Sequence, residues 1–240
     1  MKQSQAKKHD NTMTNKILMR LIALVLGLLF LEILIIHSKN EQQKSVSNQV
    51  QTARIMANGD LLYHDGLYMS ALQADGSYDF TENFTYVKPW LKQADLVLGD
   101  FEGTINPDYP LSGYPLFNAP QSVTAVISDA GYDVMDLAHN HILDSGLEGA
   151  FTTADAFKEV GIDPVGVYEN PVRDKAPLFI KNVNGIKVAI LSYAYGFNGL
   201  ESNLTEKEIA NHLSNLDEKR MKVEIERAEK EADVTVIMPQ

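Results

Sequence analysis

Three short polar clusters in this chain carry the residue types that metal and acid–base chemistry require. They are Asn58-Gly59-Asp60, Gly99-Asp100-Phe101-Glu102 and His139-Asn140-His141, and each follows a short, mostly apolar run. Carboxylate, amide and imidazole groups together suit Mn, Fe or Zn better than calcium or copper. Two such ions about 3.5–4 Å apart can clamp a phosphoryl group and activate a water molecule.

Within these clusters, the residue types suggest separate roles. Asp60, Glu102 and Asn140 are the candidate metal ligands, and His141 is the candidate acid that protonates a leaving oxygen. Each also has a structural alternative. Asp60 could cap a turn or helix, Glu102 could be a solvated loop carboxylate, Asn140 could occupy a left-handed turn, and His141 could be a hydrogen-bonded residue at a strand end.

Three further residues are candidate site or substrate contacts. His64 follows Asp60 by four residues, on a loop or a helical turn, and could equally face solvent. His139 shares a face with His141 only if the strand continues through both residues. Asn118 lies in the Pro- and Tyr-rich stretch 109–120, which forms either a lid or wall near the site or an ordinary surface loop.

Alternating apolar runs and helical patterns indicate how these clusters are positioned. The predicted strands are 53–60, 94–100, 132–140, 187–193 and 232–239, and the predicted helices are 83–93, 120–131, 146–161 and 217–232. Such alternation predicts an α/β fold. Because ligands gather at the carboxyl ends of strands in open α/β sheets, the three clusters are expected to form one site.

The first 52 residues have a different composition. Between residues 17 and 36 the only charged residues are Arg20 and Glu32, so a helix there could cross a hydrocarbon layer of about 30 Å. Five basic residues against Asp10 precede or begin this run, which favours a cytoplasmic amino terminus. We therefore predict a cytoplasmic basic tail (1–16), an uncleaved transmembrane signal anchor (17–36), an extracellular stalk (37–52) and an extracellular domain (53–240). The alternative is a buried core helix.

Charge and cysteine content exclude some functions. The chain has a net charge of −11, and the first 36 residues hold 5 of its 21 basic and 2 of its 32 acidic side chains, so the remainder carries −14. Such a surface repels nucleic acid, which is not an expected partner. The absence of cysteine leaves an exported domain to be stabilised by its core or by bound metal.

At these motifs the sequence resembles a known family, the poly-gamma-glutamate capsule biosynthesis protein CapA family, whose domain is similar to calcineurin-like metallophosphatases. The matching segments are NGDLLYHD (58–65), ADLVLGDFEG (94–103), FNAP (117–120), AGYDVMDLAHNHILDSGLEG (130–149), GIDPVGV (161–167) and NGIKVAILSY (184–193). The resemblance implies a layered metallophosphatase-type α/β fold and divalent metal ions. It makes Asp60, Glu102 and Asn140 the metal ligands and His141 the counterpart of the catalytic histidine.

The resemblance also implies a biological setting, with two departures from the pattern. It implies a membrane-anchored extracellular protein that acts with a capsule polymer synthase and export proteins on polyglutamate or its precursor.

Glu102 stands where metallophosphatases generally carry a bridging aspartate, and His212 is the only histidine after His141. We therefore expect a C-terminally truncated chain with an uncovered sheet edge. The alternative functions are a non-catalytic scaffold of the synthase complex and a generic extracytoplasmic phosphoesterase.

Overall fold

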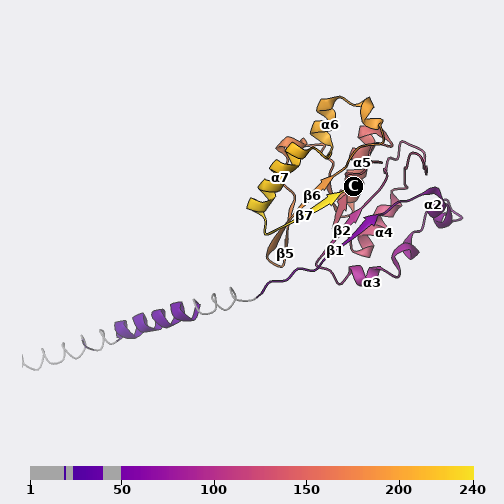
Figure 1. Cartoon of the computed structure of the whole chain (residues 1–240). Coiled ribbons are helices and arrows are strands. Elements are labelled where there is room, and N and C mark those ends of the chain that lie inside the picture. Colours follow the sequence, from indigo (N-terminus) through magenta and orange to yellow (C-terminus); the bar gives the residue numbers. More distant parts are fainter. Residues whose placement is uncertain (1–18, 20–23, 40–49) are drawn as a thin grey trace, which may run out of the picture. The chain divides into compact units, whose positions relative to one another are not determined.

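The computed structural model describes residues 19, 24–39 and 50–240, and the chain forms two compact units, Met1–Val50 and Gln51–Gln240 (Figure 1). In the first unit, residues 24–39 form a helix whose side chains are exposed. No helix within the described residues has both the length and the apolarity needed to cross a membrane. The remainder of the predicted anchor and most of the predicted stalk lie outside the described residues.

Four parallel strands form the first sheet of the second unit, in the order β1-β2-β3-β4. Their bounds are β1 Ile55–Asp60, β2 Leu96–Asp100, β3 Val134–Asp136 and β4 Asp163–Val165. Parallel strands end at the same edge of a sheet, so the residues that follow β1, β2 and β3 are brought together there.

The second sheet has the order β5-β6-β7, with β5 antiparallel and β7 parallel to β6. Its strands are β5 Ile180–Val183, β6 Ile186–Tyr193 and β7 Val234–Pro239. Asn184 and Gly185 join β5 to β6 with φ values of 54° and 88°. An Asn-Gly pair adopts positive φ readily and is favoured in two-residue hairpin turns.

The two sheets pack face to face between helices, which gives an α/β/β/α arrangement. Leu96 and Leu98 of β2 contribute to the apolar cluster between the sheets, whereas Val97 contributes to the cluster that includes residues of α4 and α5. On β6, Val188 and Ile190 face the first sheet, and the intervening Ala189 packs in the cluster with α7. This two-residue alternation lets each strand bury both faces. Figure 1 shows α7 beside β5–β7 and α4 beside β1 and β2.

Helices and 3₁₀ turns connect the strands. The helices are α2 Asp65–Ala71, α3 Lys88–Leu91, α4 Ser122–Ala130, α5 Gly146–Glu159, α6 Glu206–His212 and α7 Glu218–Glu231, and the 3₁₀ turns are η1 Thr81–Phe84, η2 Arg173–Lys175 and η3 Leu200–Asn203. Thr205 and Glu208 form a reciprocal capping box at the start of α6, and the Asp217 carboxylate accepts from the Arg220 amide at the start of α7. Both caps satisfy amide groups that have no partner within the helix.

The predicted α/β fold is confirmed, with local differences. All five predicted strands are present, but β3 ends at Asp136 rather than at residue 140. The Asp136 carboxylate accepts a hydrogen bond from the Ala138 amide at 2.8 Å, and the chain then turns instead of extending. The sequence reading missed α2, α6, β4 and β5. The strand β4 has only three residues and includes a proline, so its apolar pattern is weak.

Candidate functional site

A row of three aspartates marks the carboxyl edge of the first sheet. Asp60, Asp100 and Asp136 end β1, β2 and β3, and the sheet register pairs Asp60 with Asp100 and Asp100 with Asp136. Residues paired across neighbouring strands lie on the same face with their side chains close together. The sequence prediction chose Asp60 from this row but did not assign a role to Asp100 or Asp136.

Asp100 is the most perturbed carboxyl of the row. Its side chain is buried, and within the described residues its Oδ1 atom has no hydrogen-bond partner. Burial, together with repulsion from the neighbouring carboxylates of Asp136, Asp60 and Glu102, raises the pKa of Asp100 to about 8. A buried oxygen without a partner and surrounded by like charges is an unfavourable arrangement that a cation or a proton would relieve.

Glu102 connects this row to the loop that follows β3. Burial raises its pKa, and repulsion from Asp60 adds to the effect. Its Oε1 atom lies 3.8 Å from Nε2 of His141, whose positive charge, when protonated, would favour the carboxylate. The structure therefore brings together three of the residues predicted from sequence: Asp60, Glu102 and His141.

Asp144 and Phe117 hold the His141 ring in place. Nδ1 lies 2.7 Å from Oδ2 of Asp144, which also accepts from the Phe117 amide at 2.6 Å. The Phe117 ring packs edge-on against the imidazole, with 4.7 Å between ring centroids. Because a carboxylate can only accept, this contact assigns the proton of the neutral ring to Nδ1 and leaves Nε2 with a lone pair.

Asn198, on the loop after β6, links Asn140 to His141. Its Oδ1 atom accepts from the Asn140 amide at 3.2 Å, and its Nδ2 atom lies 3.3 Å from Nε2 of His141. Asn198 was not among the site residues predicted from the sequence. Its φ of 54° before Gly199 reflects a left-handed turn, which asparagine tolerates, so the residue had a signal for a turn rather than for a site.

His139 does not reach the same environment as His141. Its ring is fully buried, Nδ1 accepts from the His141 amide at 3.2 Å, and Nε2 has no partner within the described residues. Burial lowers the pKa of His139 to about 3, so the ring is neutral at physiological pH. Since β3 ends before this residue, the alternative in which a continuing strand places both histidines on one face is not realised.

His64 and Asn118 lie on the Phe117 side of the cluster. The His64 ring packs against Phe117 with 5.5 Å between centroids, and Nε2 accepts from the Tyr114 amide at 3.4 Å. Asn118 uses its side chain to hold the loop, since Oδ1 accepts from the Asn106 amide at 2.8 Å and Nδ2 donates to the Asn106 carbonyl at 3.0 Å. Asn118 and Asp144 also line a cavity of about 360 Å³ under the 109–116 segment.

The side chains at this edge carry the oxygen and nitrogen atoms that a divalent ion requires as ligands. Across residues 19, 24–39 and 50–240, no group of three or more His, Asp or Glu side chains is arranged to hold a metal ion. The chemistry of the set nevertheless fits a cation, because Asp60, Asp100 and Glu102 repel one another and Asp100 has a buried oxygen without a partner. Asn140 adds a neutral amide oxygen.

A family model supplies the decisive comparison, because residues 54–240 match the one described as "Bacterial capsule synthesis protein PGA_cap". The chain belongs to this family. The resemblance predicted from the motifs is therefore confirmed. The matched segment begins one residue before β1 and includes every residue of the cluster described above.

Two curated relatives of this PGA_cap chain are similar over part of their length. The capsule biosynthesis protein CapA of Bacillus anthracis is 34% identical over 119 residues, which cover 48% of this chain and 29% of the relative. The PGA biosynthesis protein CapA of Bacillus subtilis (strain 168) is 25% identical over 189 residues, or 78% of this chain and 48% of the relative. The chain spans less than half the length of either relative.

A solved structure shares the fold of the PGA_cap domain. A Staphylococcus aureus protein named as a 5′-nucleotidase, crystallised with alpha-ketoglutarate, aligns with a TM-score of 0.50 at 14% identity over 78% of this chain and 37% of that chain. At this identity the similarity concerns the fold alone. It agrees with the mixed α/β architecture and its parallel sheet.

Proposed function

We propose that this chain takes part in capsule synthesis through a metal-dependent phosphoester-hydrolysing site at the carboxyl edge of the first sheet. The observation that carries the proposal is the convergence of Asp60, Asp100, Glu102 and His141 within the segment that matches PGA_cap. The names of the curated relatives support the capsule setting over a generic phosphoesterase.

In this proposal Asp60, Asp100, Glu102 and Asn140 hold the metal. A bound divalent ion would polarise a phosphoryl oxygen and lower the pKa of a water molecule. Asp100 is added to the ligands predicted from sequence because its buried oxygen has no partner within the described residues. The burial and mutual repulsion of these carboxylates would be offset by the positive charge.

His141 holds and moves the proton in the same proposal. Asp144 orients the ring through Nδ1, so Nε2 is the nitrogen that faces Glu102. When protonated, Nε2 would donate to the leaving oxygen of the ester. Phe117 packs against the ring and limits its movement.

We further propose that residues 17–36 anchor the protein in the cell membrane, with the amino terminus in the cytoplasm and the domain outside. In this setting it would act beside a polymer synthase and export proteins on polyglutamate or a precursor. The exposed apolar side chains along the helix at 24–39 support the proposal, because such residues avoid water. Fractionation of cells that express the full chain tests this proposal. Recovery of the protein in the fraction washed from membranes without detergent would contradict it.

Metal binding and hydrolysis by the full chain test the catalytic proposal. We expect stoichiometric Mn²⁺ by elemental analysis and hydrolysis of bis(p-nitrophenyl) phosphate that is lost with chelator. Asp60→Asn and Asn140→Ala should each lower metal affinity or hydrolysis by at least about tenfold, the size of effect seen even for residues behind metal ligands. Asp155→Asn is the matched control, because Asp155 is an exposed carboxylate that pairs with Lys158 on α5.

The same variants separate catalysis from a scaffold role. If the role is catalytic, expression of Asn140→Ala or His141→Ala in cells that lack the native gene should give no capsule. Expression of Asp155→Asn in the same cells should restore it. A metal-free wild-type chain together with normal capsule from both site variants would reject the enzymatic proposal and favour the scaffold.

A further inference from the structure

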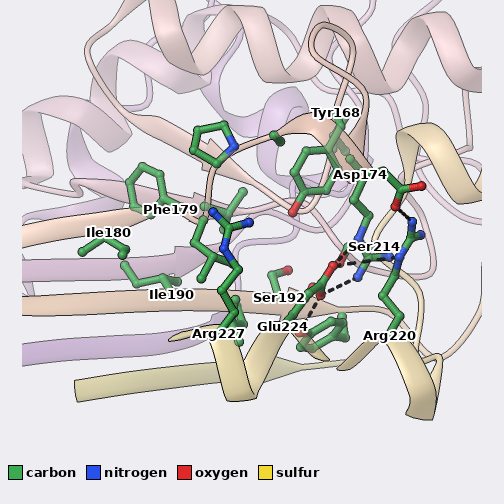
Figure 2. Close-up of a pocket in the computed structure, with 18 of the residues that line it drawn as sticks. Tyr168, Asp174, Phe179, Ile180, Ile190, Ser192, Ser214, Arg220, Glu224 and Arg227 are labelled. Atoms are coloured by element: carbon green, nitrogen blue, oxygen red, sulfur yellow. Dashed lines mark hydrogen bonds and ion pairs between the residues drawn. The ribbon is translucent and has the colours of Figure 1, made fainter. Parts of the chain in front are cut away.

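A second cavity does not include the proposed metal ligands or His141. A cavity of about 440 Å³ is lined by residues of β4, β5, β6, η2 and α7 (Figure 2). Asp60, Glu102, Asn140 and His141 are not among its lining residues. The volume is within the range of about 300–1,000 Å³ typical of small-molecule sites.

The cavity has one apolar wall. Phe179, Ile180 and Ile190 lie together on the β5–β6 side, and Leu178 and Pro164 extend this surface. Side chains of this kind bind the hydrocarbon or aromatic part of a ligand, because burying apolar surface is favourable by roughly 25 cal/mol per Å².

The opposite wall is polar and fixed by ion pairs. The Arg173 side chain is buried and donates to both carboxylate oxygens of Glu224, from Nε at 3.1 Å and from Nη2 at 2.9 Å. The Tyr193 hydroxyl also donates to Glu224 at 2.8 Å, and Arg220 pairs with Asp174. These contacts neutralise Arg173 and Arg220 and hold α7 against β6.

Arg227 is the remaining cation of the lining. It lies on α7 seven residues after Arg220 and three after Glu224, which places the three residues on one helix face. Its Nε donates to Glu231 at 2.7 Å, outside the lining set, and Figure 2 shows its guanidinium rising from α7 on the side of Phe179. Three arginines against Asp174 and Glu224 leave the lining with one positive charge, in a chain whose net charge is −11.

Tyr168 supplies a neutral donor on the same wall. Tyr168 lines the cavity, and its ring lies 6.0 Å from the Arg173 guanidinium. Burial raises the pKa of Tyr168, so its hydroxyl remains protonated at neutral pH. The hydroxyl can therefore donate to an anion without adding charge.

We propose that this cavity binds a small monocarboxylate with an apolar body, its carboxylate on Arg227 and Tyr168 and its body against Phe179, Ile180 and Ile190. The single net positive charge of the lining residues matches one carboxylate, and the guanidinium group of Arg227 can donate to both carboxylate oxygens. A phosphate dianion would bring excess negative charge beside Glu224 and Asp174. The inference is independent of the proposed phosphoesterase activity.

Calorimetric titration of the full chain tests this site. The probes are 4-phenylbutyrate, the uncharged 4-phenylbutanol and inorganic phosphate. We expect saturable one-to-one binding of 4-phenylbutyrate, with at least tenfold weaker binding of the alcohol and of phosphate. Arg227→Gln should weaken the binding of 4-phenylbutyrate at least tenfold, and Tyr168→Phe should weaken it at least threefold.

Two control variants separate ligand contact from general charge or packing effects. Lys219→Gln removes an exposed positive charge from the same helix and should leave affinity unchanged. Glu231→Gln removes the carboxylate that competes with the ligand for Arg227, so it should not weaken binding. Arg227 is 46% exposed, so its variant should keep the wild-type melting temperature. Absence of saturable binding, equal binding of the alcohol or phosphate, or an unchanged affinity in Arg227→Gln would overturn the proposal.

Discussion

At the scale of single residues, the position of His141 is determined by side chains that contribute no chemistry of their own in the proposed reaction. Asp144 contacts Nδ1, Asn198 lies near Nε2, and Phe117 packs against the ring. Asp144 is nearly inaccessible to solvent, so its contact with His141 is shielded from water and stronger than a surface pair. The orientation of the ring therefore depends on Asp144 more than on Asn198, which is exposed.

The variant Asp144→Asn tests this dependence. We expect phosphodiester hydrolysis to fall by about tenfold to a hundredfold, because the amide no longer fixes the proton on Nδ1, while bound Mn²⁺ stays at the wild-type level. Initial rates and elemental analysis on the same preparations measure both quantities. Loss of metal in parallel with activity, or full activity, would contradict a purely orienting role.

At the scale of elements, the β5–β6 hairpin depends on a turn that only particular residues can form. Asn184 and Gly185 both have positive φ, and Gly185 has a φ of 88°. The second strand of the hairpin, β6, pairs with β7. It also carries Ser192, whose hydroxyl donates to the Asp136 carboxylate of the first sheet. Burial raises the pKa of Asp136 to about 7, and the hydrogen bond from Ser192 opposes that rise.

We expect Gly185→Ala to lower the free energy of unfolding by about 1–2 kcal/mol, the cost of a left-handed conformation for a residue with a Cβ. The nearest atoms to the added methyl belong to the Gln51 side chain, which can move, so sterics add little. Gly66→Ala in α2 is the control, since it has open space and ordinary φ, and should be neutral or slightly stabilising. Urea unfolding compares the two, and equal stabilities would contradict the turn argument.

At the scale of the whole molecule, stability of the second unit depends on the contact between the two sheets. Leu98 at the centre of β2 is fully buried and packs in the same cluster as Val188 and Ile190 of β6. This cluster joins segments separated by about ninety residues in the chain, so its apolar contacts form only when both sheets are in place. The carboxylate row lies at the edge of this packed interface.

Leu98→Ala should therefore lower the free energy of unfolding by about 2–5 kcal/mol, through lost burial and the cavity that remains. Leu67→Ala on α2 is the matched control, because Leu67 is 42% exposed and its truncation should cost less than about 1 kcal/mol. Urea unfolding followed by tryptophan fluorescence at Trp90 measures both. A cost below 1 kcal/mol for Leu98→Ala would contradict the proposed importance of the sheet interface.

Much of the local structure could be predicted from the sequence because it depends on neighbouring residues. The short apolar runs of β2 and β6 predicted buried strands, and the polar residues after β1, β2 and β3 predicted a shared edge. The Asn184-Gly185 pair is also a local signal for the β5–β6 hairpin turn. The family resemblance likewise rested on contiguous motifs.

The sequence by itself determined the α/β fold, the family and the position of Asp60, Glu102 and His141 at one sheet edge. Only the tertiary structure decided that Asp100 has a buried oxygen without a partner among the described residues, that Asp144 and Asn198 contact His141, and that Arg227 lines a cavity. Burial and contacts between distant segments arise when the two sheets pack, so they leave no short-range pattern. Local periodicity therefore reveals where the strands end but not which charges the folded protein leaves without a partner.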